Sequence, residues 1–149
     1  MLIKLLPEQV SKHWNDVKWA IEQSLPPIVG MQSDRMSNIL TAILTEELVV
    51  WISVEKRTSE NVITGLVVTS LLFDKPSGTK SLLIYCIYGY SNSTAESWKG
   101  GFETLRKYGV GKSCNRIIGY TDVNSIIKFA QGVGAETRYT LVSFPLGGD

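Results

Sequence analysis

A polar stretch, SNSTAES (91–97), has the residue types best suited to chemistry in this chain. It separates an apolar tract, SLLIYCIYGY (81–90), from a segment with helical spacing of its apolar residues. Hydroxyl side chains and the free backbone N–H groups of a helix N-terminus can hold the phosphates of a nucleotide or coenzyme. The stretch therefore predicts either an anion site or a helix cap formed by Ser93 or Thr94.

Tyrosines are the second group of candidates. Tyr85, Tyr88 and Tyr90 recur along the apolar tract, where they either pack against helices or line a cleft to which Tyr88 or Tyr90 offers a hydroxyl. Glu55 lies at the end of another apolar tract. It is either a solvated charge or a base that takes a proton from an amine.

Histidine and cysteine usage argues against several other chemistries. His13 is the single histidine, and Cys86 and Cys114 lie far apart without CxxC spacing. This pattern favours two reduced thiols over a disulfide framework, and it predicts neither a histidine triad nor a metal site.

Size and composition indicate one ordinary globular domain spanning residues 1–149. Hydrophobic residues make up 44% and charged residues 19%, with a formal net charge of +1. These values argue against disorder and against a basic surface for nucleic acid. The apolar runs are too short to span a membrane, so we expect a cytoplasmic protein.

Apolar periodicity and turn residues predict the order of helices and strands. Strands are expected at 2–6, 48–56, 61–74, 81–90 and 116–121, and one more strand or a broken pair at 136–146. Helices are expected at 8–25, from a Ser33 or Asp34 cap to residue 44, from a Ser93 or Thr94 cap to Gly109, and from an Asp122 cap to Gly132. The fold class is α+β.

This order of elements resembles the GNAT superfamily of acyl-CoA-dependent N-acetyltransferases. SLLIYCIYGY is similar to the family's fourth strand, and WKGGFETLRKYGVGKSCNRIIGYTD to the coenzyme-side helix and fifth strand. DVNSIIKFAQGVGAETRYTLVSFPL is similar to the closing region, with Asn124 and Gly134 at matching places. The resemblance implies a mixed, mostly antiparallel sheet, splayed between the fourth and fifth strands, with helices on both faces.

The resemblance also implies acetyl-CoA as coenzyme and an amine as acceptor. The thioester would meet backbone donors of Cys86, Ile87 and Tyr88. The pyrophosphate would lie at the start of the following helix. The residues implied there are Ser93, Thr94, Ala95, Ser97 and Lys99, and Asn124 is implied on the next helix.

Two departures from the family pattern keep a second hypothesis open. The phosphate loop lacks its spaced glycines and carries Trp98, and Ala130 stands where many members have a tyrosine acid. The alternative is a catalytically silent GNAT-fold protein that binds a protein partner or a second copy of itself. Compact bacteriophage proteins of this kind include internal virion components, which would place it in a virion. Under either hypothesis we expect Trp98 to pack into the core, and Trp19 keeps a partner surface open.

Overall fold

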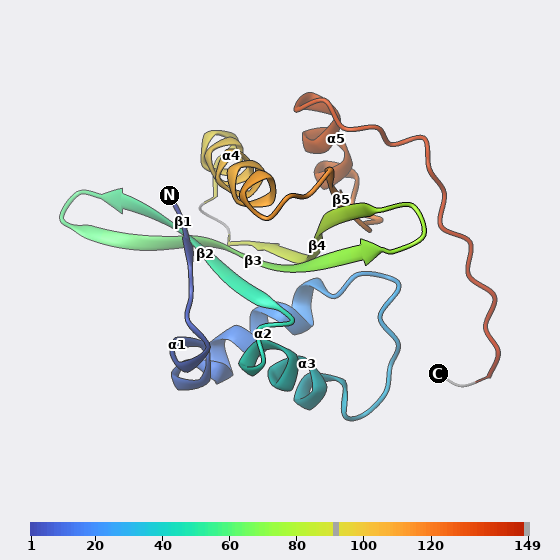
Figure 1. Ribbon diagram of the computed structural model, residues 1–149. Coiled ribbons are helices and arrows are strands. Elements are labelled where there is room, and N and C mark those ends of the chain that lie inside the picture. Colours follow the sequence, from blue (N-terminus) through green and yellow to red (C-terminus); the bar gives the residue numbers. More distant parts are fainter. Residues whose placement is uncertain (91–92, 148–149) are drawn as a thin grey trace.

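The computed structural model describes residues 1–90 and 93–147 and forms a five-stranded sheet between two layers of helices (Figure 1). The elements follow in the order β1 (Leu2–Lys4), α1 (Pro7–Lys12), α2 (Trp14–Ser24), α3 (Arg35–Leu44), β2 (Val49–Arg57), β3 (Glu60–Asp74), β4 (Thr79–Gly89), α4 (Ala95–Gly111), β5 (Arg116–Gly119) and α5 (Asn124–Gly132).

The sheet has the strand order β1-β2-β3-β4-β5. Its first four strands are antiparallel to their neighbours, whereas β5 runs parallel to β4. Helices α1, α2 and α3 cover one face, and α4 and α5 cover the other (Figure 1). This arrangement confirms the predicted mixed, mostly antiparallel sheet with helices on both faces.

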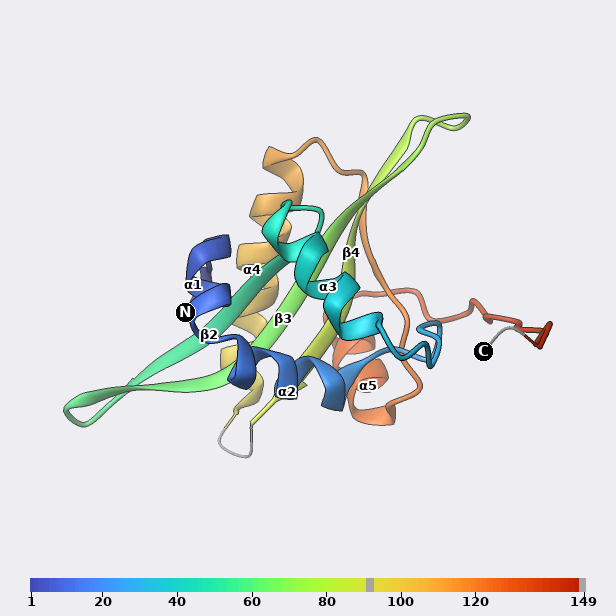
Figure 2. The same cartoon turned by 90° about the horizontal axis from the view of Figure 1, so that it is seen from below.

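Each face of the sheet has its own apolar core. Beneath α1–α3, the buried cluster includes Val10, Ile21, Ile43 and Val68. Beneath α4, a second cluster includes Leu82, Leu105 and Trp51. The long hairpins β2–β3 and β3–β4 extend past these cores at opposite ends (Figure 2). The sheet is therefore held by both cores in its middle, and the hairpins project beyond them.

A β-bulge at Tyr85 shapes the middle of β4. Val68 pairs with Cys86 while Thr69 pairs with Ile84, so Tyr85 has no partner in β3. Tyr85 and Cys86 consequently both pack on the α1–α3 side, whereas Ile84 and Ile87 pack on the α4 side. Because a bulge bends its strand and increases the local twist, β4 diverges from β5 after this point.

Three sequence predictions are wrong in detail. The helix expected over 8–25 is interrupted at His13, which is the C-cap residue of α1 and the N-cap residue of α2, so two short helices replace one long one. Asp122 does not cap α5, because Val123 is the N-cap residue and its N–H bonds to the Thr121 hydroxyl at 3.1 Å. Residues 136–146 form no strand, since no neighbouring strand lies beside them.

Candidate functional site

An opening in the sheet lies between the second half of β4 and the end of β5. The two strands pair only from Ser81 with Arg116 to Ile84 with Gly119. Beyond that point β4 continues to Gly89, and the chain after Gly119 turns toward α5. The predicted splay between these two strands is therefore present.

The backbone of β4 presents polar groups to this opening. The N–H of Tyr90 donates to the carbonyl of Thr64 on β3 at 3.1 Å. Backbone groups of successive strand residues point alternately to the two sides, so Tyr88 also faces β3. The N–H and C=O groups of Ile87 and Gly89 consequently face the opening. Of the backbone donors that the resemblance implied, Ile87 directs its N–H to the opening, whereas Tyr88 directs its N–H toward β3.

The N-terminus of α4 is anchored to the sheet by hydroxyl groups. Thr94 is the N-cap residue, and its side chain accepts a hydrogen bond from the Ser97 N–H at 3.2 Å. The Ser97 hydroxyl in turn lies 3.2 Å from that of Ser53 and 3.4 Å from that of the fully buried Thr64. Of the two predicted caps, Ser93 and Thr94, the structure selects Thr94, and the hydroxyl cluster fixes where this helix starts.

A carboxylate already faces this helix start. The Thr94 hydroxyl donates to Oε1 of Glu55 at 3.4 Å, and Nη2 of Arg57 donates to Oε2 at 2.9 Å. Hydrogen bonds from Arg57 and Ser97 lower the pKa of Glu55 below its ordinary value. Glu55 is therefore an anion beside the positive end of α4.

Trp98 packs against the sheet, as predicted. It is half-buried and contacts the core cluster beneath α4. A Cβ atom added to Gly65 would lie 2.8 Å from Cη2 of Trp98, and one added to Gly89 would lie 3.0 Å from Cζ2. The indole therefore rests on two facing glycines of β3 and β4, next to the opening.

Aromatic side chains lie on the opposite face of the sheet, which α1, α2 and α3 cover. Tyr88 makes edge-to-face contacts with Tyr90 at 4.9 Å and with Trp19 at 5.4 Å between ring centroids. Burial raises the pKa of Tyr90, and the nearby Tyr88 and Asp16 add to the effect. The Tyr90 hydroxyl therefore stays protonated at neutral pH and can donate a hydrogen bond.

The structure separates the three residues proposed for catalysis. Tyr88 and Tyr90 lie together on the α2 side of the sheet, whereas Glu55 faces the start of α4 on the other side. Cys86 is buried, and burial raises the pKa of its thiol to about 11. A thiol of this kind is not a nucleophile at neutral pH.

The remaining implied residues fall into two places. Ser93, Thr94, Ala95 and Ser97 surround the start of α4, and Lys99 is exposed one turn into that helix. Asn124 is the first residue of α5 and is exposed, five residues beyond the end of β5.

Sequence reasoning missed Ser53, Thr64 and the glycines beneath Trp98. A signal for Gly65 was present, because a glycine inside a strand pattern often marks a close approach.

Within the described ranges 1–90 and 93–147, no three histidine, cysteine or carboxylate residues are grouped so that they can hold a metal ion. Over the same ranges, no helix has both the length and the apolar character needed to cross a membrane.

The architecture is that of the GNAT acetyltransferases. A structure described as a probable acetyltransferase superposes with a TM-score of 0.71 at 12% sequence identity, covering 100% of this chain and 99% of the other. Aminoglycoside N-acetyltransferase AAC(6')-Iy, solved with a bisubstrate analogue of coenzyme A, gives a TM-score of 0.69 at 18% identity, covering 97% and 96%.

A third similar structure is a ribosomal-protein-alanine N-acetyltransferase from Brucella melitensis. Its TM-score is 0.67 at 11% identity, covering 98% of this chain and 99% of the other. No protein-family model matches the sequence, and neither does any curated protein. At these identities the likeness shows the fold, and the chemistry has to be argued from the site.

Proposed function

We propose that this protein is an acyl-CoA-dependent N-acyltransferase that moves an acetyl group from acetyl-CoA to an amine. The observation that carries the proposal is the opening between β4 and β5, with the backbone groups of Ile87 and Gly89 directed into it. Structures of similar fold have been solved with coenzyme A or a coenzyme A analogue bound. The opening is of the kind that an extended pantetheine arm requires.

The residues around the opening fit the two ends of the coenzyme unequally. The Ile87 N–H suits a thioester carbonyl, because a fixed backbone donor stabilises the negative charge that develops on this oxygen. At the phosphate end, Ser93 and the first N–H groups of α4 are donors, and Lys99 supplies a positive charge. The Glu55 carboxylate beside Thr94 opposes an anion there.

Direct transfer needs no covalent enzyme intermediate. The amine nitrogen bonds to the acetyl carbon as the carbon–sulfur bond breaks, the nitrogen loses a proton, and the coenzyme thiolate gains one. Tyr88 and Tyr90 line the α2 side of the opening, and the Tyr90 hydroxyl, which is protonated, is suited to give the thiolate its proton. Glu55 faces the α4 side of the sheet. To act as the base there, it would have to receive the proton of the amine through the opening.

Calorimetric titration with acetyl-CoA tests the proposal, followed by an assay of acetyl transfer to a panel of amines. We expect saturable binding, which Lys99→Ala weakens several-fold. Lys107→Ala is the matched control, because it removes an exposed cation from the same helix away from its N-terminus. Absence of binding heat at millimolar acetyl-CoA would contradict the proposal.

A second function is favoured by the start of α4 itself. Glu55 places a negative charge there, Trp98 fills the space against the glycines, and Ala130 supplies no proton to a thiolate. These features suit a GNAT-fold protein that has lost catalysis and acts as a structural or interaction module. Such a protein binds no acetyl-CoA in the titration.

The two functions also differ in location. An acetyltransferase acts in the cytoplasm, where acetyl-CoA is made, whereas a structural module of bacteriophage origin would be recovered with virions. Mass spectrometry of purified virions from a host that expresses the protein separates these two locations.

A further inference from the structure

A cavity of about 350 Å³ lies where the start of β2, the second half of β3 and the end of α4 meet. Its lining combines acidic, hydroxyl and apolar side chains, among them those of Glu46, Glu47, Thr69, Tyr108, Val49 and Leu82. A cavity of this size holds a small ligand, whose chemistry must match these side chains.

This cavity is separate from the opening between β4 and β5. Leu82 pairs with Ile117 of β5, so the two strands are still joined beside the cavity. The opening begins only after Ile84. Leu82 and Ile87 are separated by roughly 15 Å along β4, at about 3.3 Å per residue. A ligand in the cavity is therefore out of reach of the site proposed for acyl transfer.

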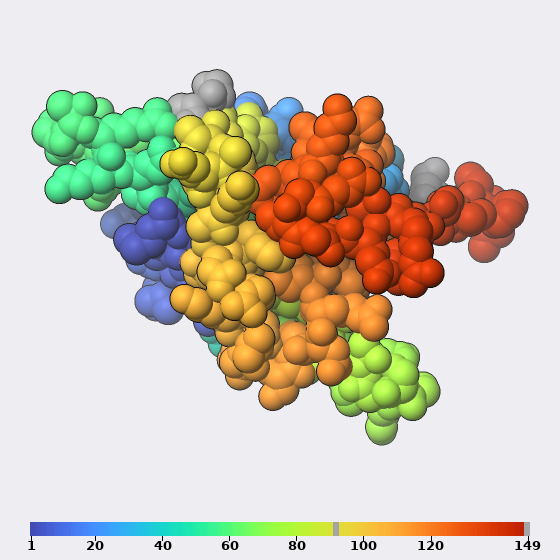
Figure 3. All heavy atoms as spheres, turned by 90° about the horizontal axis from the view of Figure 1, so that it is seen from above, coloured from blue at the N-terminus to red at the C-terminus, as the bar shows by residue number. Residues whose placement is uncertain are grey.

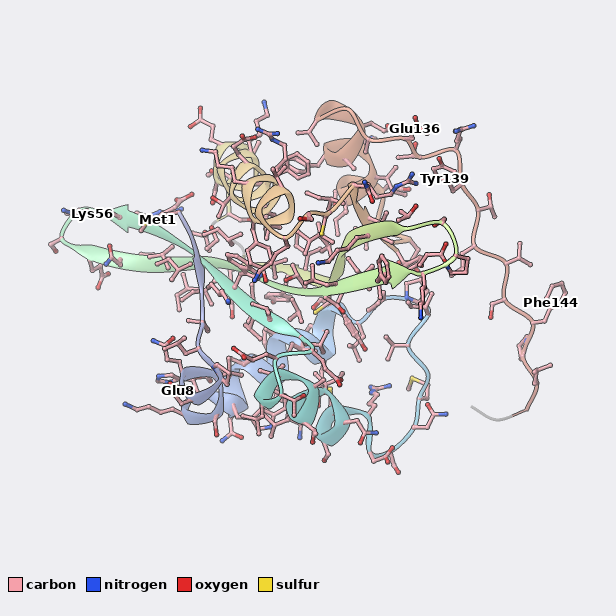
Figure 4. The ribbon with its side chains drawn as sticks, in the orientation of Figure 1. Met1, Glu8, Lys56, Glu136, Tyr139 and Phe144 are labelled. Carbon is pink, nitrogen blue, oxygen red and sulfur yellow. The ribbon has the colours of Figure 1, made fainter. Side chains whose placement is uncertain are left out.

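The two sites lie toward opposite ends of the sheet. Figure 3 shows the end of α4 and the β3–β4 hairpin at one end of the molecule, and the start of α4 at the other. Lys56, which follows Glu55 in β2, lies at the tip of the β2–β3 hairpin, opposite the β3–β4 hairpin (Figure 4). The start of β2 thus serves the cavity, whereas the end of β2 serves the candidate site.

Glu46 and Glu47 give the cavity a negative charge. The Glu46 N–H donates to the Ile43 carbonyl at 3.1 Å. The Glu47 N–H donates to the Ala42 carbonyl at 2.8 Å, so both carboxylates are carried by a hydrogen-bonded turn. Within residues 1–90 and 93–147, neither carboxylate pairs with a lysine or arginine, and no lysine or arginine lines the cavity. A positively charged ligand is therefore favoured.

Thr69 supplies a buried hydroxyl to the same cavity. Its side chain is 1% exposed, and its oxygen accepts a hydrogen bond from Nε1 of Trp51 at 2.9 Å. The hydroxyl proton of Thr69 has no acceptor in the part of the chain that the structure describes. Because a buried donor is costly without an acceptor, this proton calls for an oxygen atom of a bound molecule.

Tyr108 supplies a second hydroxyl, and its ring is held in place. Trp51 contacts the ring edge-to-face at 5.0 Å, and the Nζ atoms of Lys4 and Lys112 lie over it at 5.8 Å and 5.7 Å from the centroid. The hydroxyl makes no hydrogen bond to a described residue. Burial raises the pKa of Tyr108, so this hydroxyl is protonated at neutral pH and is available to a ligand.

We propose that this cavity binds a small amino alcohol, a molecule that carries a primary ammonium group and a hydroxyl group on an aliphatic chain. The ammonium group donates to the carboxylates of Glu46 and Glu47, and the ligand hydroxyl accepts from Thr69 or Tyr108. Its aliphatic chain packs on the apolar side chains of the lining. A divalent metal ion fits less well, because it needs several more oxygen ligands than two carboxylates.

A titration followed by two-dimensional ¹H–¹⁵N NMR tests the proposal, with aminobutanol as the probe. The Trp51 indole N–H donates to Thr69, so its signal reports on this hydroxyl and is assigned by its loss in Trp51→Phe. We expect saturable shifts of this signal and of the amides of residues 46–49 and 69–71. The dissociation constant should be on the order of 1 mM, as is usual for a ligand of few atoms.

Two ligands of the same length test which groups are recognised. Butanediol lacks the ammonium group and butylamine lacks the hydroxyl, so each should bind at least about 5-fold more weakly than aminobutanol. Equal binding of the three ligands overturns the proposal. So does the absence of a saturable shift, which is expected if only water occupies the cavity.

Variants test which residues hold the ligand. The double variant Glu46→Gln, Glu47→Gln should bind aminobutanol at least about 10-fold more weakly, and Tyr108→Phe about 3- to 10-fold more weakly. Glu8→Gln, Glu60→Gln is the matched control, because it removes two exposed carboxylates outside the cavity lining. Unchanged affinity in the first double variant overturns the proposal. Shifts at the amides of Ile87 and Gly89 instead of the cavity also overturn it, and no result depends on acetyl-CoA.

Discussion

The hydroxyl of Thr94 donates a hydrogen bond to the carboxylate of Glu55 across 3.4 Å, joining the first residue of the α4 cap to the far end of β2. The positive end of α4 therefore already faces an anion belonging to the protein. Under the proposed function, an incoming pyrophosphate would meet this charge at the place where the fold offers its donors. Glu55 would then oppose coenzyme binding while it supports the helix.

Replacing Glu55 with glutamine should strengthen the binding of acetyl-CoA by about 3- to 10-fold, because the amide keeps the hydrogen-bonding shape and removes the negative charge. Calorimetric titration measures the change. Glu103→Gln is the matched control, since Glu103 pairs with Arg106 within α4, away from the start of that helix. This substitution should leave the affinity for acetyl-CoA unchanged. Unchanged or weaker binding in Glu55→Gln would show that the carboxylate does not oppose the coenzyme.

Trp98→Ala should lower the free energy of unfolding by about 2–4 kcal/mol, because most of the indole is buried against the core beneath α4 and its removal leaves a cavity. Chemical denaturation measures the loss. Trp19→Ala removes an equally large ring that is 50% exposed, so it should cost markedly less. Equal losses for the two variants would mean that Trp98 does not anchor α4.

Gly65→Ala should destabilise the protein by about 1–3 kcal/mol, because its new methyl group would lie 2.8 Å from Cη2 of Trp98 and 3.3 Å from the Tyr88 carbonyl oxygen. In a Trp98→Ala background the clash with the indole is gone, so the same substitution should cost less. A double-mutant cycle by chemical denaturation measures this coupling. Additive losses would show that the two residues are not in contact.

The stability of the protein should fall as the pH rises from about 9 to 11. Burial raises the pKa of the Cys86 thiol from its ordinary value of 9.0 to about 11, so in this window the unfolded chain releases a proton that the folded chain keeps. The stabilisation is complete below pH 9 and is lost as the pH rises through 11, a change of up to about 3 kcal/mol.

Denaturation curves at several pH values measure this loss for Cys86→Ala and for Cys114→Ala. The slope between pH 9 and 11 should flatten in Cys86→Ala and persist in Cys114→Ala, where the buried thiol remains. Tyr85 and Tyr90 also have raised pKa values and add to the loss above pH 10, so some slope should remain at the top of the range. An identical slope in the two variants would assign the whole effect to the tyrosines.

Much of the fold could be predicted from local patterns. The alternation and β-branched residues of 48–56, 61–74 and 81–90 correspond to β2, β3 and β4, because each pattern reflects which side of one strand is buried. The Thr94 cap was predictable for the same reason, since its bond to the Ser97 N–H spans three residues. The start of α5 was harder to predict. Asp122 and Thr121 both have side chains that can cap a helix, and only the path of the backbone selects between them.

The amino-acid sequence by itself thus determined most of the strands and helices and the residues gathered at the start of α4, but not the break at His13 or the absence of a strand over 136–146. Only the tertiary structure decided what faces that helix start. Glu55 and Thr94 are 39 residues apart, and Trp98 meets Gly65 on another strand. The Tyr85 bulge, which opens the sheet beside Ile87, likewise depends on the register between β3 and β4. Such relationships arise from strand pairing and helix packing over long sequence separations, and no local pattern encodes them.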